Sequence, residues 1–158
     1  MLSSRPFGIL LAAFFTLSFL AACDTDSSPF RVDYSLAEEL VFDTTGFESR
    51  TTESGLIIYE LDPGIGTLEV VSRDNVLLYY TIRFKPTNDI IESSYANNST
   101  FPLQFNGIAS SANRLGDGFV EGVLGMKEGG KRVVVIPPTE SVYSDTVIVD
   151  LEVDSILF

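Results

Sequence analysis

Residues 118–126 read Gly118-Phe119-Val120-Glu121-Gly122-Val123-Leu124-Gly125-Met126, and they are the strongest indication of the fold. The large apolar residues Phe119, Val123 and Met126 fall at helical spacing. Glycine is a poor helix former, and this stretch contains three of them. We therefore expect one short helix that is held in place by packing against the rest of the domain.

Segments rich in β-branched and aromatic residues lie on both sides of this helix. Turn signals separate them, and Pro86-Thr87-Asn88-Asp89 between two such segments indicates a hairpin. We predict strands at residues 56–61, 76–84, 90–91, 101–105, 131–136 and 146–153. Many strands with one short apolar helix predict an α+β domain, in which a twisted antiparallel β-sheet wraps around that helix.

The N-terminus has the pattern of a secretory signal. One positive charge within residues 1–5 precedes an apolar run at 7–22, which is shorter than the roughly 20 residues of a membrane-spanning helix. The run ends in Leu20-Ala21-Ala22-Cys23, which looks like the lipobox of bacterial lipoproteins. This resemblance implies cleavage before Cys23, lipid on its sulfur, and attachment to a membrane of the cell envelope. Which membrane and which face are left open.

The chain is thus expected to have three parts. Residues 1–22 are a lipoprotein signal peptide, 23–53 a lipidated N-terminus with a mostly flexible tether, and 54–158 the folded domain. The tether is rich in Ser, Thr, Asp and Glu. Within it, a short helix over residues 35–41 is expected, with Ser35 as N-cap and Glu38 completing a capping box.

Composition excludes several kinds of chemistry. The chain has no histidine, which rules out Ser-His-Asp and Cys-His nucleophile systems and the common zinc sites. Its formal net charge is −12, so nucleic acid and anionic headgroups are repelled and nucleic acid is not an expected partner. The single cysteine is assigned to the lipid, so no disulfide is expected. We expect no metal and no cofactor.

Seven short phrases follow one another along residues 54–158. They are Ser54-Gly55-Leu56, Tyr79-Tyr80-Thr81, Glu92-Ser93-Ser94, Glu121-Gly122-Val123-Leu124-Gly125-Met126, Gly129-Gly130-Lys131-Arg132, Ile136-Pro137-Pro138 and Val149-Asp150-Leu151-Glu152-Val153. In this order the set resembles the FKBP-type peptidyl-prolyl isomerases. The resemblance implies an FKBP-like fold and an apolar pocket that takes proline-containing polypeptides.

Prolyl isomerisation suits a chain of this composition. The barrier to rotation about a peptide bond is about 18–20 kcal/mol, because planarity delocalises the nitrogen lone pair. No bond to carbon or nitrogen has to break, so neither a nucleophile nor a metal is required. A dry apolar pocket with a few hydrogen bonds favours the twisted, less polar amide.

The resemblance also implies which residues line the pocket. The catalytic residues carried over from the family are Tyr80, Phe101, Phe119 and Tyr143, the last with its register shifted by one residue. The substrate-binding residues carried over are Ile91, Glu92, Leu115, Gly116 and Val149.

The chain departs from the family pattern at several of these positions. Ile91-Glu92 replaces a usual Phe-Asp, Phe119 replaces a common tryptophan and Val149 a phenylalanine. Only Ser144-Asp145 separates Tyr143 from the predicted last strand, where the family has a long overhanging loop.

Two functions therefore remain open. One is an envelope prolyl isomerase or folding helper that acts on X-Pro bonds of exported proteins. The other is a catalytically degenerate FKBP-fold lipoprotein that binds or scaffolds. An open pocket would favour the first, and a pocket filled by Ile91 and Leu115 the second. Client proteins, immunosuppressant binding and oligomeric state are not indicated by the sequence.

Overall fold

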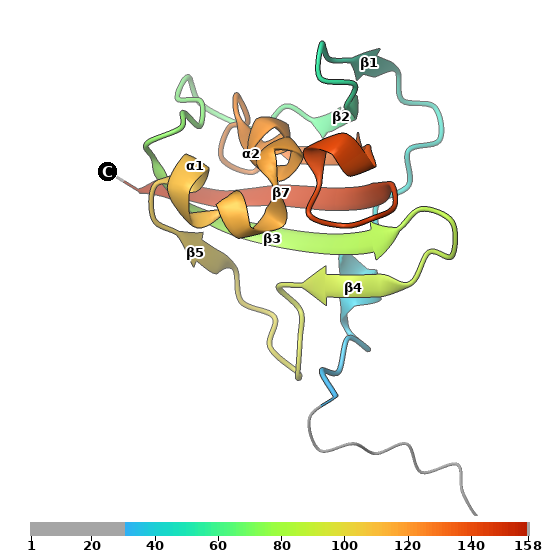
Figure 1. Cartoon of the computed structure of the whole chain (residues 1–158). Helices are drawn as coiled ribbons and strands as arrows, with labels where there is room; N and C mark the ends of the chain where they lie inside the picture. Colours follow the sequence, from blue (N-terminus) through green and yellow to red (C-terminus); the bar gives the residue numbers. More distant parts are fainter. Residues whose placement is uncertain (1–30, 158) are drawn as a thin grey trace, which may run out of the picture. The chain divides into compact units, whose positions relative to one another are not determined.

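A twisted antiparallel sheet of seven strands dominates the computed structural model, which describes residues 31–157 (Figure 1). The predicted signal peptide and Cys23 lie outside the described residues. The strands are β1 Ser49–Thr51, β2 Ile57–Asp62, β3 Asn75–Phe84, β4 Ile90–Ser93, β5 Leu103–Phe105, β6 Lys131–Ile136 and β7 Val147–Leu157. Their order is β1-β2-β6-β7-β3-β4, and β5 pairs with β3. The predicted antiparallel α+β architecture is confirmed.

The centre of the sheet is the long pair β3–β7. Its register runs from Asn75 opposite Leu157 to Phe84 opposite Val147, with one irregularity between Leu77 and Leu78. Successive side chains of a strand point to opposite faces. One face of β3 therefore carries the buried residues Val76, Leu78, Tyr80 and Ile82, which belong to the main hydrophobic core. We call this the inner face of the sheet.

In the described part of the chain two α-helices and three 3-10 helices accompany the sheet: α1 Ile108–Ser111, α2 Asp117–Val123, η1 Ala37–Leu40, η2 Asn113–Leu115 and η3 Pro138–Glu140. In α2, Phe119 and Val123 are buried against the inner face, so the expected short, packed helix is confirmed. A Cβ atom at Gly118 would lie 2.5 Å from Ile136 Cγ2, and one at Gly122 would lie 3.0 Å from a Val134 methyl carbon. The glycines that weaken α2 as a helix thus allow it to lie directly on β6.

Arg132 holds the other end of α2. Its Nη1 donates to the carbonyl oxygens of Gly122 at 2.8 Å and Leu124 at 3.1 Å, while Nε and Nη2 donate to Glu60 Oε2 at 3.0 and 2.7 Å. The last carbonyls of a helix have no partner within it, and a nearby cation stabilises them. The buried Arg132 therefore joins the C-terminal end of α2 to β6 and β2.

Residues 32–53 belong to the segment that was expected to be a mostly flexible tether. Residues 37–42 of it lie on the opposite, outer face of the sheet. The compact unit begins at Val32, not Ser54. Ala37 and Leu40 are buried, and β1 extends the sheet beside β2. The expected helix at 35–41 is a shorter 3-10 helix without a side-chain cap. The segment is ordered because its backbone bonds to buried polar groups: Phe42 N–H donates to Asp150 Oδ1, and Thr81 Oγ1 donates to the Ala37 carbonyl.

The predicted strands agree with the observed ones to within a few residues at each end. Among them β7 differs most, because it continues to Leu157, where its last residues pair with the first residues of β3. Strand β1 was not predicted. Within residues 31–157 no helix is long and apolar enough to cross a bilayer.

Candidate active site

Three aromatic rings form a floor on the inner face of the sheet. Tyr80 from β3 meets Phe119 from α2 edge-to-face at 5.4 Å and Phe105 from β5 at 6.0 Å, and Phe105 and Phe119 lie 5.9 Å apart. All three are at least 96% buried. Such edge-to-face pairs add about 0.5–1.5 kcal/mol beyond the area that they bury. The three rings fix the position of the Tyr80 hydroxyl.

Four polar side chains, Tyr80 among them, meet around the carboxylate of Glu92. Tyr80 Oη donates to Glu92 Oε1 at 2.6 Å, and Arg114 Nη1 donates to the same oxygen at 2.7 Å. Arg114 Nη2 also donates to Tyr80 Oη at 3.2 Å, and Tyr143 Oη donates to Glu92 Oε2 at 3.4 Å. We call these residues the Glu92 cluster. The carboxylate of Glu92 thus accepts from three side chains of three other segments of the chain.

The strand register explains why Glu92 and Tyr80 meet. Glu92 lies opposite Ile82 in the β3–β4 pair, so Tyr80 is its diagonal neighbour on the same face. Diagonal neighbours in an antiparallel pair are within reach of long side chains. Tyr143 comes from residues 141–146, which connect η3 to β7, and its ring packs edge-to-face on Phe84 at 6.0 Å. No such local rule brings Arg114 to the cluster.

Both tyrosine hydroxyls remain donors over the physiological pH range. Burial, followed by the hydrogen bond to Glu92 and its negative charge, raises the pKa of Tyr80 well above its ordinary value, and Arg114 offsets this in part. Burial and the charge of Glu92 raise the pKa of Tyr143 to about 12. Each hydroxyl therefore offers a proton to an acceptor and does not act as a base.

The structure brings most of the predicted site residues together. Leu115 and Val149 are buried in the core beside Tyr80 and Phe119, and Ile91 and Tyr143 pack against this core. Gly116 has φ 96°, and a Cβ atom there would lie 2.9 Å from the Glu140 carbonyl oxygen. A glycine is therefore needed where η3 approaches the start of α2.

Phe101 is the exception among the predicted residues. Its side chain is 74% exposed, and it precedes the strand β5, which begins at Leu103. The register pairs Phe105 with Val76, and Phe105 is the aromatic residue that contacts Tyr80 and Phe119. The aromatic wall expected from Phe101 is thus supplied by Phe105 in this structure.

Sequence reasoning did not identify Arg114 or Phe105 as site residues. Phe105 could have been found, because it lies in a predicted strand that alternates Leu103-Gln104-Phe105. Arg114 is separated from Glu92 by 22 positions and belongs to no motif, so only the tertiary structure pairs them. Tyr34 was also missed: its hydroxyl donates to the Ile91 carbonyl at 3.2 Å and joins the N-terminal segment to β4.

The aromatic floor is covered in this structure. Tyr80 is 0% and Phe119 1% exposed, whereas the side chains of Glu92 and Arg114 are 24% and 53% exposed. The charged pair therefore lies on the solvent side of the rings. A ligand can reach the floor only after side chains above it move.

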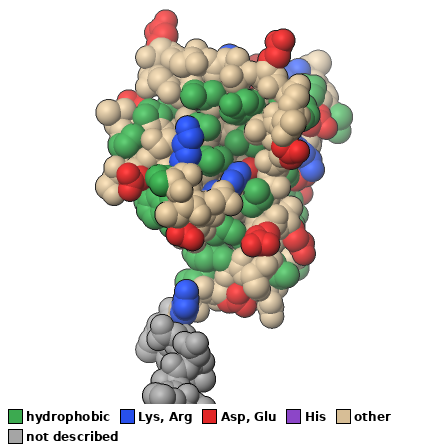
Figure 2. Space-filling model, turned by 90° about the vertical axis from the view of Figure 1, so that its right-hand side faces the viewer, with side chains coloured by type: hydrophobic (Ala, Val, Ile, Leu, Met, Phe, Trp, Pro, Cys, Tyr) green, Lys and Arg blue, Asp and Glu red, His purple; other side chains and the backbone are tan. Residues whose placement is uncertain are grey.

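The acidic character of the chain does not create a metal site in the described part. No group of three or more Asp, Glu or Cys residues within it is arranged to hold a metal ion. In the face shown in Figure 2, the acidic side chains are spread over the surface and do not form one cluster.

Comparisons with known proteins agree with this geometry. The family model of FKBP-type peptidyl-prolyl cis-trans isomerases matches residues 66–149, which is more than half of the chain. No curated protein sequence matches the chain.

Three solved structures illustrate the likeness in fold. The crystal structure of FkpA from Escherichia coli has a TM-score of 0.58 and 24% identity, over 68% of this chain and 51% of that one. The N-terminal domain of FKBP42 from Arabidopsis thaliana has a TM-score of 0.60 and 15% identity, over 75% of this chain and 98% of that one. A peptidyl-prolyl cis-trans isomerase from Pseudomonas syringae has a TM-score of 0.56 and 19% identity, over 78% of this chain and 88% of that one.

The chain spans about half the length of FkpA, so the likeness to that protein concerns the shared domain alone. Strands β3 to β6, the short helix α2 and the three rings of the aromatic floor lie within the segment that the family model matches. The chain belongs to the FKBP-type peptidyl-prolyl cis-trans isomerase family.

Proposed function

We propose that this protein catalyses the cis–trans isomerisation of X-Pro bonds in polypeptides of the cell envelope. The observation that carries the proposal is the Glu92 cluster, which holds two protonated tyrosine hydroxyls above an apolar aromatic floor. Membership of the family supports the reaction class. The signal-like N-terminus and Cys23 support a lipid-anchored location.

The geometry fits the requirements of the reaction. A twisted amide is less polar than a planar one, so burial of the proline against Tyr80 and Phe119 favours the transition state. The carbonyl of the rotating bond needs a hydrogen-bond donor. Tyr143 is suited to this role, because its hydroxyl is protonated and half-buried, and among the described residues it is engaged only by a long 3.4 Å bond. Each tenfold increase in rate requires about 1.4 kcal/mol of preferential binding to the transition state.

The experiment is a prolyl isomerisation assay on the soluble chain from Asp24 to Phe158. We expect a rate above the spontaneous one. In Tyr143→Phe kcat/KM should fall about tenfold, which corresponds to the free energy of about one hydrogen bond. Tyr59→Phe is the matched control, because Tyr59 lies on β2 and takes no part in the Glu92 cluster. A folded, monodisperse protein without activity would exclude the isomerase.

A second function is favoured by one observation. The aromatic floor is covered, Leu115 is buried in the core beside it, and Ile91 packs against that core. A protein that keeps this arrangement would bind partners through its surface without catalysing prolyl isomerisation. In that case the Tyr143→Phe protein would bind its polypeptide partners as tightly as the wild type, and neither would accelerate isomerisation.

A further inference from the structure

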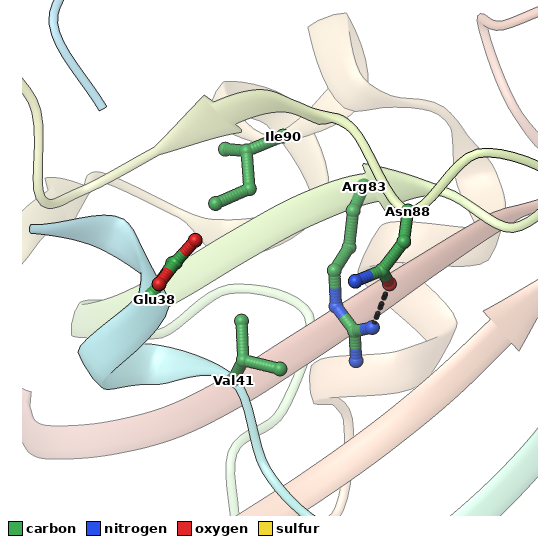
Figure 3. A pocket seen from close by; sticks show the side chains of 5 residues that line it. All are labelled: Glu38, Val41, Arg83, Asn88 and Ile90. Atoms are coloured by element: carbon green, nitrogen blue, oxygen red, sulfur yellow. Dashed lines mark hydrogen bonds between the residues drawn. The ribbon is translucent and has the colours of Figure 1, made fainter. Parts of the chain in front are cut away.

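A pocket lies on the outer face of the sheet. It has a volume of about 270 Å³ and is lined by Glu38, Val41, Arg83, Asn88 and Ile90, from η1, the residue after it, β3, the β3–β4 turn and β4 (Figure 3). Arg83 and Tyr80 are three positions apart on β3, so their side chains point to opposite faces of the sheet. The outer pocket is therefore separate from the Glu92 cluster.

One end of the outer pocket is built to donate hydrogen bonds. The Arg83 side chain is only 10% exposed and is fixed by Asp150, through Nε at 2.9 Å and Nη2 at 3.3 Å, and by Asn88 Oδ1, to which Nη1 donates. A guanidinium carries five N–H groups. Among the described residues three of them are used, which leaves two, and the Asn88 side-chain amide adds N–H donors of its own. This end suits a carbonyl oxygen.

The opposite end of the pocket is acidic. In Figure 3 Glu38 and Ile90 lie on one side of the pocket and Arg83 and Asn88 on the other, with Val41 below. Glu38 forms no ion pair with any residue that the structure describes. Because Asp150 neutralises Arg83, the pocket retains the single negative charge of Glu38. Charge complementarity therefore favours a monocation over an anion or a zwitterion.

We propose that the outer pocket binds an aliphatic primary ammonium group whose chain also carries an amide carbonyl. The ammonium pairs with Glu38, the carbonyl accepts from Arg83 and Asn88, and the methylene groups lie on Val41 and Ile90. The volume of about 270 Å³ leaves room for a short aliphatic chain of this kind. A lysine residue of a polypeptide and a free amino amide share this chemistry.

The test is an NMR titration of the isotope-labelled unit Val32–Phe158, which has its own hydrophobic core and is expected to fold by itself. The probe is 6-aminohexanamide, compared with hexanamide, which lacks the ammonium, and 6-aminohexanoate, which is a zwitterion. We expect saturable shifts of the amides of Glu38, Asn88 and Ile90, with affinity at least about tenfold lower for either comparison compound, equivalent to about 1.4 kcal/mol.

Glu38→Gln and Glu39→Gln provide the matched pair of variants. Both residues are exposed in η1, so neither exchange threatens the fold, but only Glu38 lines the pocket. Glu38→Gln is expected to weaken the binding of 6-aminohexanamide about tenfold and to leave the binding of hexanamide unchanged. Glu39→Gln is expected to change the affinity for neither compound. Absence of saturable shifts, equal binding of hexanamide, or equal effects of the two variants would overturn the proposal.

The source of the ligand is tested separately with Nα-acetyl-lysine methylamide. Tighter binding of this compound than of 6-aminohexanamide identifies a lysine of a polypeptide as the ligand, and weaker binding identifies a free amine. Either result supports the site. None of these titrations depends on isomerase activity, so the outer pocket and the proposed function can fail independently.

Discussion

The two faces of the β3–β7 strand pair are both covered, but their chemistry differs. On the inner face Leu78 and Tyr80 pack against α2, and stability comes from apolar burial. On the outer face Thr81 and Arg83 of the same strand are also buried, beneath η1 and the chain that follows it. There each buried polar group has a partner, and Asp150 accepts from Arg83 and from the backbone of Phe42.

This difference shows what each cover requires. An apolar face accepts any well-packed helix, since dispersion and desolvation have little directional preference. A polar face needs a cover with matching donors and acceptors, because an unpaired buried group costs free energy. The N-terminal segment therefore stays in place through specific hydrogen bonds, although its composition is that of a tether.

The largest expected effect is on the inner face. Phe119→Ala removes the ring that contacts both Tyr80 and Phe105, and such truncations cost about 3–5 kcal/mol. Denaturant unfolding should show this loss, and prolyl isomerisation should fall with it. Phe119→Leu is the control, since it keeps most of the volume. A loss below 1 kcal/mol for the alanine variant would mean that α2 contributes little to the core.

On the outer face, Arg83→Met is expected to cost about 3 kcal/mol at pH 7, because it leaves Asp150 charged and unpaired in a buried position. The double variant Arg83→Met, Asp150→Leu should recover most of this loss. If the double variant is as unstable as the single one, packing and not charge pairing holds the outer face.

The same variant has a predictable pH dependence. Burial raises the pKa of Asp150, and the hydrogen bond from Arg83 opposes this. Removal of Arg83 raises the pKa further, so the folded variant binds a proton more readily than the unfolded chain does. Its stability relative to wild type should therefore improve as pH falls from 7 towards the ordinary pKa of an aspartate. If the difference in unfolding free energy between variant and wild type were the same at pH 7 and near the ordinary pKa of an aspartate, this explanation would be wrong.

A smaller effect is expected above the aromatic floor. The Arg114–Glu92 pair is more than half exposed on the arginine side, and such pairs contribute about 0.2–1 kcal/mol. Arg114→Gln should therefore leave the unfolding free energy nearly unchanged, but it should alter the KM of the isomerisation, because this side chain covers the floor. Arg50→Gln, on the edge strand β1, is the matched control. An unchanged KM would show that substrate enters without moving Arg114.

The smallest effect is expected at Phe101. Because this side chain is 74% exposed and lies outside the aromatic floor, Phe101→Ala should change both stability and kcat/KM only slightly, within about 0.5 kcal/mol. Phe105→Ala should be far more damaging. The reverse order would show that the 94–102 loop closes over bound substrate and brings Phe101 to the site.

Much of the fold was predictable from the sequence, and particular residues show why. The alternation in 76–84 and the spacing of Phe119 and Val123 identify the inner face, because burial of one face imposes a period on the sequence. Tyr80, Glu92 and Val149 lie in the colinear phrases, and Leu115 follows from the resemblance to the family. The structure brings these residues together. The role of Phe101 could not be predicted, since the start of β5 depends on its pairing with β3.

The sequence by itself determined the periodic features, which are six of the strands and the short helix with its glycines. Its composition determined the acidic charge and the absence of histidine chemistry. Only the tertiary structure decided which distant polar residues meet. Arg114 reaches Glu92. Asp150 accepts hydrogen bonds from Arg83 and from the backbone N–H of Phe42, which is 108 positions away from it. The physical reason is that apolar burial leaves a repeating pattern along the chain. A hydrogen bond between remote residues depends on where the fold places two particular side chains, and this leaves no pattern in the local sequence.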